Sequence, residues 1–315
     1  MANTKKGGSD SADRSKLKVW LDGRLMNYYD AKVPILTHSL QYGSGMFEGI
    51  RAYETEKGTA IFRLKDHVKR FFRTAKIYQI DLGYSESAIE KAIIECVVQS
   101  RLSSCYIRPF AFYNSDRVGL ATHGTDVSVY VAAVPFGAYY GKGRDSGIRC
   151  KTTTWRRINS EILPVEAKGS GNYLNSLMAH KEAIRSGFDE AIMLSAQGRI
   201  AEGPAENIFL YMNDYLMTPD YSADILIGIT RDSIIEIARS IGIEVLEVEM
   251  HKEELYTADE VFFTGTAAEI TPIVNVDGVD VGDGKPGKIT KRLAREYTDV
   301  VLGKNSRFAK WLTYI

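Results

Sequence analysis

A short segment near the middle of the chain most constrains how it can fold. Residues 135–143 contain one proline and three glycines, and strand-like patterns precede and follow them. Such residues end helices and strands, so the segment indicates a boundary between two folding units, for which 315 residues suffice. We predict a disordered tail over 1–16, a small domain over 17–136, an interdomain loop over 137–146 and a large domain over 147–315.

Five stretches carry apolar residues at three- and four-residue steps, which is the spacing of an amphipathic helix. In the first of them, Leu64, Phe71 and Tyr78 share one face. The stretches are long enough for ordinary globular helices. The predicted helices are 64–78, 87–101, 173–186, 231–241 and 288–302.

Runs of β-branched and aromatic residues alternate with these helices and predict strands. Asp22 and Gly23 between two short apolar runs indicate a hairpin. Because hairpins join antiparallel strands, we expect an α+β fold with mostly antiparallel or mixed sheets. The predicted strands after the hairpin are 60–63, 106–113, 127–134, 148–155, 190–194, 207–211, 243–249 and 260–264.

The balance of charge argues against several classes of function. Lys and Arg total 40 and Asp and Glu total 40, so the chain lacks the basic surplus of proteins that grip nucleic acids or membrane surfaces. No apolar run approaches the roughly 18 residues of a membrane span, and residues 1–16 lack the apolar core of a signal peptide. The three cysteines form no C-x-x-C motif, so we expect no disulfide framework and a reducing, cytoplasmic location.

Two glycine-rich motifs are similar to nucleotide-binding loops but fail in their details. After Gly43 and Gly45, the third glycine of a dinucleotide motif comes one residue late, at Gly49. Residues 282–288 are followed by Ile289, where a phosphate loop needs serine or threonine. A nucleotide-binding module is therefore a minor alternative. The five histidines show no metal-ligand spacing, so we predict no metal site.

Four stretches of the second half combine residues suited to one kind of chemistry. Residues 167–173 place a lysine before a bare backbone that can lie against a flat ligand. Residues 201–209 carry two acids, and residues 228–231 begin a predicted helix, whose free N–H groups favour phosphate. The small residues of 264–270 leave backbone amides open to a ligand. Each stretch also has an ordinary reading: a surface lysine, a solvated loop, a cap by Thr230 and a tight turn.

With segments of the first half, these stretches resemble the branched-chain amino-acid aminotransferases, which are fold type IV pyridoxal-phosphate enzymes. The resemblance runs from about Trp20 to about Leu302. It implies the two-domain fold of that group, and transamination of leucine, isoleucine and valine with 2-oxoglutarate by a ping-pong mechanism that yields L-glutamate. It also implies a homodimer or hexamer. The segments of the first half that carry it are 39–43, 47–51, 62–63 and 106–109.

The resemblance implies pyridoxal 5′-phosphate as the cofactor and assigns residues to each of its parts. Lys168 is the amine that holds the cofactor covalently and then moves a proton. Glu202 keeps the ring nitrogen protonated, so that the ring can withdraw electrons, and Tyr173 binds the ring oxygen. The residues implied for the phosphate are Arg63, Ile229, Thr230 and Thr266.

The resemblance also implies a pocket that accepts both an aliphatic side chain and the second carboxylate of glutamate. Arg108, beside Tyr106, would meet that distal carboxylate. The apolar wall is implied to consist of Tyr42, Phe47, Phe136 and Tyr139. The α-carboxylate would contact Tyr106, Thr266, Ala267 and Ala268.

Two residues depart from the family pattern, and several alternatives stay open. Pro204 stands where the family usually has a small flexible residue and could shift Glu202, while Phe136 replaces a frequent tryptophan and could enlarge the pocket. Phe47 and Phe136 could instead be plain core, and Arg108 could form an internal ion pair. Other enzymes of the same scaffold are D-amino-acid aminotransferases, amine transaminases and aminodeoxychorismate lyases; a non-catalytic relative is a further alternative.

Overall fold

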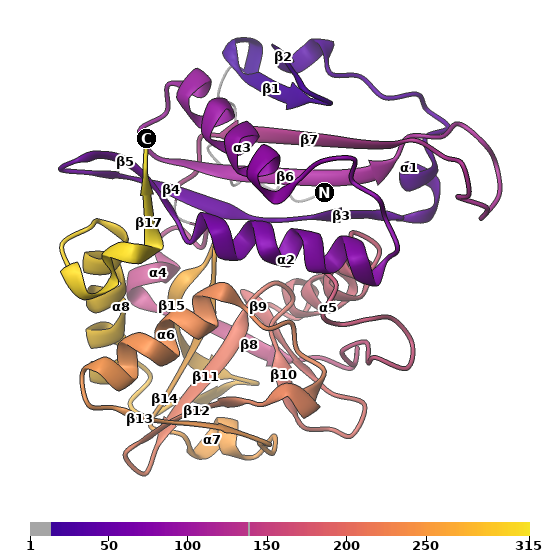
Figure 1. Ribbon diagram of the computed structural model, residues 1–315. Helices are drawn as coiled ribbons and strands as arrows, with labels where there is room; N and C mark the ends of the chain where they lie inside the picture. The colour runs from indigo at the N-terminus through magenta and orange to yellow at the C-terminus, as the bar shows by residue number, and fades with distance from the viewer. Residues whose placement is uncertain (1–13, 138) are drawn as a thin grey trace, which may run out of the picture.

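Two β-sheets organise the molecule, one above the other in Figure 1, with helices around and between them. The computed structural model describes residues 14–137 and 139–315. The predicted α+β class with antiparallel and mixed sheets is confirmed. Of the predicted tail, residues 1–13 lie outside the described residues, and Arg14–Lys16 form a short 3-10 helix, η1.

The first sheet has eight strands, and all of its pairs are antiparallel. The strand order is β17-β5-β4-β6-β7-β1-β2, with β3 paired to β6. The expected hairpin at Asp22 and Gly23 joins β1 to β2, and Gly23 has the positive φ that such a turn requires. The strands are β1 (Lys18–Leu21), β2 (Arg24–Asn27), β3 (Gly45–Phe47), β4 (Ile50–Thr55), β5 (Gly58–Phe62), β6 (Cys105–Tyr113), β7 (Val127–Val134) and β17 (Leu312–Tyr314).

Two long helices pack on the first sheet, α2 (Leu64–Ile77) and α3 (Glu86–Ser100). The apolar face of α2 includes Val68 and Phe71, which join the core beneath the sheet. Ser85 caps α3, because its hydroxyl accepts the N–H of Ala88 at 3.2 Å. In Figure 1, α2 lies between the two sheets, so its far side faces the second half of the chain.

The second sheet has nine strands and closes on itself. Its order is β10-β9-β8-β15-β14-β11-β12-β13, and β10 also pairs with β11, so six strands form a ring whose seam is the pair Glu202 and Asn207. The pairs of β8 with β9, β8 with β15 and β12 with β13 are parallel. The strands are β8 (Ile148–Thr152), β9 (Glu190–Leu194), β10 (Ile200–Glu202), β11 (Asn207–Met212), β12 (Tyr215–Pro219), β13 (Glu244–Val248), β14 (Glu260–Gly265), β15 (Glu269–Val276) and β16 (Val279–Asp280).

All five predicted helices form, and each boundary lies within two residues of its predicted position. The short helices were not predicted, and neither were seven strands, the longest of them β15: β3, β4, β10, β12, β15, β16 and β17. The remaining helices are α1 (His38–Tyr42), α4 (Gly143–Ser146), α5 (Tyr173–Arg185), α6 (Ile229–Ser240), α7 (Glu254–Thr257), α8 (Lys288–Val301), η2 (Tyr28–Asp30), η3 (Tyr221–Ala223) and η4 (Ser306–Trp311).

The end of the chain departs from the predicted division into domains. Strand β17 pairs with β5 of the first sheet, although it belongs to the segment assigned to the large domain. Trp311 packs edge-to-face on Phe62, and one apolar core combines residues of both halves. Within the predicted boundary at 137–146, residues 143–146 form α4. Strand β17 ties the end of the chain to the sheet of the first half.

Two further features bear on the class of protein. Within the described ranges, no helix is both long and apolar enough to span a membrane. The three cysteines are buried and unpaired, and burial raises the pKa of the Cys96 thiol to about 11 and that of Cys105 to about 12. Such thiols stay protonated and make poor nucleophiles.

Candidate active site

Lys168 lies where the two halves of the chain meet. Its backbone carbonyl accepts the N–H of Phe47 at 3.0 Å, and its own N–H donates to Oγ1 of Thr74 at 3.2 Å. The Nζ atom donates to Oη of Tyr173 at 2.8 Å and lies 5.2 Å from the centre of the Phe47 ring. Both halves therefore fix the lysine, and its amine contacts the tyrosine predicted to act with it.

The glycines after Lys168 serve close backbone packing. A Cβ atom on Gly169 would lie only 2.6 Å from the ring carbon Cζ of Tyr78. A Cβ atom on Gly171 would lie 3.1 Å from the carbonyl oxygen of Gly43. The bare backbone thus lets the two halves approach each other closely.

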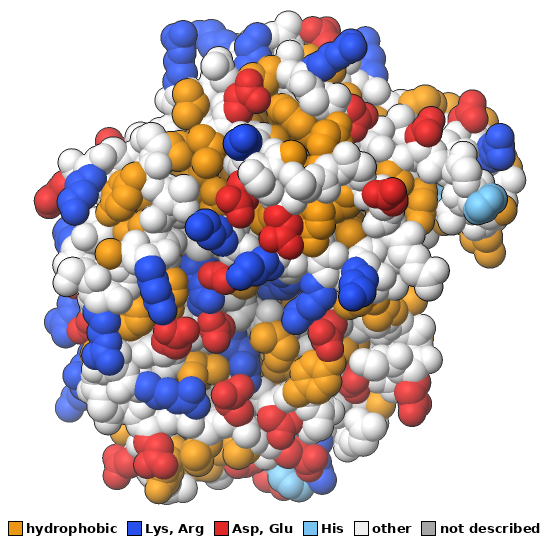
Figure 2. Space-filling view, in the orientation of Figure 1, with side chains coloured by type: hydrophobic (Ala, Val, Ile, Leu, Met, Phe, Trp, Pro, Cys, Tyr) orange, Lys and Arg blue, Asp and Glu red, His pale blue; other side chains and the backbone are white. Residues whose placement is uncertain are grey.

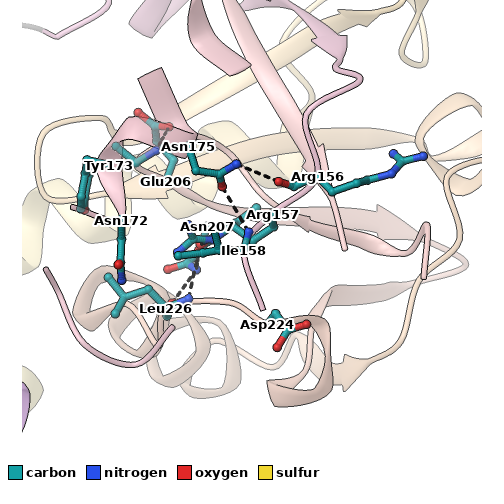
Figure 3. A network of polar contacts seen from close by, with 12 residues as sticks. Arg156, Arg157, Ile158, Asn172, Tyr173, Asn175, Glu206, Asn207, Asp224 and Leu226 are labelled. Atoms are coloured by element: carbon teal, nitrogen blue, oxygen red, sulfur yellow. Dashed lines mark hydrogen bonds and ion pairs between the residues drawn. The ribbon is translucent and has the colours of Figure 1, made fainter. Parts of the chain in front are cut away.

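Glu202 is buried at the seam of the second sheet. It is the last residue of β10 and is buried, so the alternative of a solvated loop does not hold for it. Its Oε1 lies 2.6 Å from Nε of Arg157, and its Oε2 accepts Nδ2 of Asn207 at 3.1 Å and the N–H of Leu226 at 3.2 Å. Figure 3 shows Arg157, Asn207 and Leu226 side by side around this point. Burial raises the pKa of Glu202, and the charge of Arg157 opposes that rise.

The first turn of α6 forms an open seat for an anion. Helix α6 begins two residues earlier than predicted, so Ile229 and Thr230 are its first residues and Gly228 is its N-cap. Among the residues that the structure describes, no side chain caps this helix start. A Cβ atom on Gly228 would collide with Oδ1 of Asn207, so the glycine lets the helix start pack beside the Glu202 network. Free N–H groups and the helix dipole together favour a phosphate at this point.

The start of α8 shows the opposite case. The N–H groups of Ile289 and Thr290 donate to the carboxylate of Glu260 at 2.9 and 2.7 Å. The glycine-rich stretch before α8 is therefore closed by a protein carboxylate, which leaves no room there for a phosphate. This geometry argues against the nucleotide-binding alternative for residues 282–288.

Arg63 does not reach this site, which corrects the phosphate role assigned to it. Its Nε lies 2.6 Å from Asp66, its Nη1 lies 2.6 Å from Asp232, and its guanidinium stacks on the indole of Trp311. Arg70, seven residues later on the buried face of α2, lines the cavity in its place. Sequence analysis missed Arg70, and its place among buried apolar residues of a helix was the available signal.

Arg70 is held by a buried carboxylate. Its Nε and Nη2 donate to Glu48 at 2.7 and 2.8 Å, and its Nη1 donates to the carbonyl of Ile227 at 3.1 Å. Nδ1 of His67 also lies 2.8 Å from Glu48. The guanidinium pulls the pKa of Glu48 far below its usual range, although burial alone would raise it. Arg70 thus carries a fixed positive charge beside the start of α6.

These groups line one narrow cavity between the two halves. Six of the seven residues predicted for the cofactor are among its lining residues, and Arg63 is the exception. Oγ1 of Thr264, also in the lining, is buried without a hydrogen-bond partner. The predicted residues in the lining are Lys168, Tyr173, Glu202, Ile229, Thr230 and Thr266.

A second, wider cleft of about 1220 Å³ holds most of the predicted substrate residues. The two-residue period of β6 places Tyr106 and Arg108 on one face, and Nη2 of Arg108 donates to Oη of Tyr106 at 2.9 Å. The Arg108 guanidinium also stacks 4.4 Å from the Phe47 ring centre. In the described part of the chain, Arg108 has no ion-pair partner and its Nε is buried and unbonded, so the internal ion pair is absent. The predicted residues that line the cleft are Tyr106, Arg108, Phe136, Tyr139 and Ala267.

Besides Thr266, which lines the narrow cavity, three predicted substrate residues lie outside the lining of this cleft. Phe47 is buried between the two cavities, 4.8 Å from the Tyr173 ring, so it is a wall of the site and part of the core. Tyr42 is half-exposed, and its Oη accepts the N–H of Gly119. Ala268 is buried, and its carbonyl accepts a bond from a neighbouring threonine. The structure therefore does not bring Tyr42 and Ala268 to the pocket of this chain.

Comparison with known proteins gives matches along nearly the whole chain. The amino-transferase class IV family matches residues 45–276. A branched-chain-amino-acid aminotransferase of Pseudomonas aeruginosa is 44% identical over 305 residues, covering 96% of this chain and 99% of that protein. The protein of the same name from Escherichia coli K12 is 40% identical over 301 residues, covering 94% and 97%.

Solved structures agree with these matches. The branched-chain aminotransferase of Thermoproteus uzoniensis, solved with norvaline, is 46% identical with a TM-score of 0.90, covering 94% of this chain and 98% of that one. The branched-chain amino acid aminotransferase of Thermobaculum terrenum, solved in its PLP-form, is 31% identical with a TM-score of 0.90, covering 95% and 98%. A further branched-chain amino acid aminotransferase has been solved with pyridoxamine 5′-phosphate and with N-(5′-phosphopyridoxyl)-L-glutamate.

Proposed function

The chain belongs to the class IV aminotransferases, and from this premise we propose that it transfers amino groups between branched-chain L-amino acids and 2-oxoglutarate. The cofactor is pyridoxal 5′-phosphate, which solved relatives contain in its aldehyde or aminated form. The substrates are leucine, isoleucine and valine, and the products are their 2-oxo acids and L-glutamate. The observation that carries the proposal is the meeting of Lys168, Glu202 and the uncapped start of α6 on one cavity wall.

The residues of this cavity fit each part of the cofactor. An aldehyde needs an amine, and Lys168 is the one lysine among the described residues that line the cavity. A pyridine nitrogen needs an acid, and Glu202 is fixed there by Arg157 and Asn207. A phosphate needs N–H groups and positive charge, which α6 and Arg70 offer. The unbonded Thr264 hydroxyl gives a further free polar group.

The chemistry then follows from where the protein holds charges and protons. When bound, the cofactor supplies an aldehyde and an electron-withdrawing ring. Lys168 Nζ would be the base that takes the proton from the α-carbon of the substrate and delivers it to the cofactor carbon that carried the aldehyde. Tyr173 stays hydrogen-bonded to that amine and orients it. Glu202 holds a proton at the ring nitrogen, because it is buried beside Arg157 and Asn207 and cannot turn away.

The wide cleft explains how one pocket takes two kinds of side chain. Phe136 and Tyr139 give an apolar wall for leucine, isoleucine and valine. Arg108 is free of carboxylate partners among the described residues and already oriented by Tyr106, so it binds the distal carboxylate of glutamate or 2-oxoglutarate. The turn of Thr266 and Ala267 takes the α-carboxylate through its N–H groups.

We also propose a homo-oligomer, at least a dimer, with the hexamer as the larger form. Large apolar side chains in the lining of the wide cleft are exposed, among them Leu40 at 63% and Val33 at 49%. Exposed apolar groups of this size mark contact surfaces. Tyr42 lies on the same edge, bound to Gly119, so it serves a neighbouring subunit's pocket in the assembly. Free, buried thiols support the proposed cytoplasmic location.

An amino-donor panel with 2-oxoglutarate tests the function. Leucine, isoleucine and valine should form glutamate, whereas D-alanine, aliphatic amines and aminodeoxychorismate should not react. Borohydride reduction of the loaded protein, followed by peptide mass mapping, should place the added cofactor mass on Lys168. Turnover of none of the three branched-chain donors would overturn the proposal, and a mass on another lysine would overturn the assignment of Lys168.

A further inference from the structure

A chain of polar groups leads from the catalytic cavity to the surface of the second half. Glu206 lines the cavity and is buried. Oη of Tyr140 lies 2.9 Å from Oε1 of Glu206 and 3.2 Å from Oε2 of Glu190. Nδ1 of His180 lies 2.8 Å from Oε1 of Glu190, and 40% of its side chain is exposed. The mechanism above uses none of these four residues.

The geometry of this series of polar groups determines how many protons its two carboxyl groups carry. The Tyr140 hydroxyl carries one hydrogen and stands between two carboxyl groups, so it can donate to one of them only. The second contact becomes a hydrogen bond only if that carboxyl group is protonated and donates to the tyrosine oxygen. With both acids ionised, one buried carboxylate oxygen would face a lone pair at hydrogen-bond distance, which is strongly unfavourable.

The surroundings decide which acid carries the proton. Glu190 accepts a ring N–H from His180, and its Oε1 also accepts the backbone N–H of Ala191 at 2.9 Å. Glu206 accepts one backbone N–H, from Ala205 at 3.0 Å. The hydrogen bond to Glu190 raises the pKa of His180, so the imidazole places positive charge beside Glu190 and not beside Glu206. The proton therefore belongs on Glu206, which donates to Tyr140, while Tyr140 donates to Glu190.

Glu206 lies beneath the turn that we assign to the substrate α-carboxylate. A Cβ atom on Gly265 would be 3.7 Å from Cγ of Glu206, and Gly265 and Thr266 line the same cavity. A negative charge on Glu206 would therefore repel an anion held by this turn. A neutral acid leaves the positive field of the backbone N–H groups intact.

We propose that Glu206 stands in the active site as a neutral carboxylic acid, held so by Tyr140, Glu190 and His180, and that this neutrality is a condition for binding the substrate carboxylate. That Glu206 helps to position the substrate rests on the proposed function, whereas the protonation state of Glu206 does not. Burial and the nearby Glu190 raise the pKa of Glu206 to about 8, in agreement. The titratable groups that face the pair are Glu202, Tyr139, Tyr140, Cys150 and His180.

Infrared spectroscopy of the cofactor-loaded protein tests the protonation state directly. At pH 7 the wild type should show a protonated-carboxyl stretching band that Glu206→Gln removes. Tyr140→Phe should weaken the band, because the contact that holds the proton on Glu206 is lost, and should shift what remains of it to higher frequency. The matched control, Glu253→Gln, removes a side chain that is 77% exposed and should leave the band unchanged.

Kinetics test the consequence for the substrate. If only the neutral form of Glu206 binds it, the KM of wild type for leucine should rise about tenfold between pH 7 and pH 9, as the competent fraction falls. Glu206→Gln should show a flat KM over the same range, and Glu253→Gln should follow the wild type.

Two results would overturn the proposal. The first is a carboxyl band that survives Glu206→Gln and disappears in Glu190→Gln, since the proton would then sit on the other acid. The second is a KM for Glu206→Gln that rises with pH as the wild type does. Because the infrared result needs no turnover, a failure of the aminotransferase assignment would show separately in the donor panel.

Discussion

At the scale of single residues, the role proposed for Arg108 is to separate the two kinds of substrate. Arg108→Ala removes the cation for the distal carboxylate of glutamate and keeps the apolar wall, so glutamate turnover should fall far more than leucine turnover. A lost hydrogen bond to a charged group is worth about 1.5–3 kcal/mol, or roughly 10- to 100-fold in kcat/KM. The exposed Arg295 on α8 gives the control variant, Arg295→Ala. Equal losses for both substrates would show that Arg108 is structural.

Glu48 is the residue whose loss should most disturb the phosphate end of the site. Glu48→Gln leaves Arg70 buried with half of its bidentate partner and without a compensating charge. Breaking such a buried pair costs about 3–5 kcal/mol of stability. We expect a lower melting temperature and weaker cofactor binding, measured by calorimetry and by absorbance titration. Unchanged cofactor affinity in a folded Glu48→Gln variant would argue that Arg70 does not hold the phosphate.

The pKa of Glu206 also predicts how stability depends on pH. Its pKa in the folded state is raised to about 8, so the folded protein keeps a proton that the unfolded chain loses above its ordinary value of 4.5. Stability should therefore fall as the pH rises from 4.5 to 8, by at most about 1.4 kcal/mol per pH unit. The free energy of unfolding, measured with denaturant and plotted against pH, should be similar for wild type and Glu206→Gln at low pH. The two plots should diverge toward pH 8. Parallel curves would contradict a raised pKa.

Residues also mark where sequence reasoning stops. Lys168, Glu202 and Tyr173 could be singled out because each lies in a short motif, and the structure brings them to one cavity. Sequence analysis assigned the phosphate to Arg63, whereas the structure places Arg70 at the cavity. Where each arginine side chain lies is decided by partners that are distant in the sequence. Asp232 and Trp311 come from other elements and draw Arg63 away from the cavity, and no local pattern around residue 63 reports them.

At the scale of elements, two helix starts invite a matched comparison. Gly228→Ala and Gly287→Ala each place a methyl group against a side chain, Asn207 in one case and Glu260 in the other. Overpacking of this kind costs about 1–3 kcal/mol, so both variants should be less stable. Only Gly228→Ala should lose cofactor affinity, by tenfold or more, because α6 is the open helix start. Similar affinity losses in both variants would contradict the phosphate seat on α6.

The long helices were predicted well, whereas among the strands the eight-residue β15 and the six-residue β4 were missed together with shorter ones. Five helices have enough turns for their apolar period to be read, so their existence and ends follow from the sequence. Strand β10 has three residues and closes the ring through tertiary pairing, so its position at Glu202 has no local signature. Strand β17 is equally short, and its partner β5 lies far earlier in the chain, as pairs such as Leu312 with Phe62 show.

At the scale of the whole molecule, the shared strand should make the two halves unfold together. Leu312 is buried in the core that combines both halves. Leu312→Asp places a charge there and should lower the free energy of unfolding by more than about 3 kcal/mol, with the control Lys310→Ala near zero. Calorimetry of the wild type should show one transition. Two transitions in the wild type would show that the halves are independent.

The charge pattern of the whole molecule agrees with a protein that handles small anions. Acidic and basic side chains are mixed over the face shown in Figure 2, and Lys and Arg gather near the junction of the two halves. The equal numbers of acidic and basic residues in the sequence are therefore also well mixed on this face. Positive charge is concentrated locally, at Arg70 and Arg108, where the site needs it.

The cofactor site is complete only when the strands that meet at the seam between Glu202 and Asn207 have paired. Glu202, the acid proposed to meet the ring nitrogen of the cofactor, is placed by the strand pair that closes the six-strand ring. A partly folded chain can present the lysine but lacks the environment that makes it productive. The absorbance of correctly bound cofactor should thus appear late in refolding and report that the six-strand ring has closed.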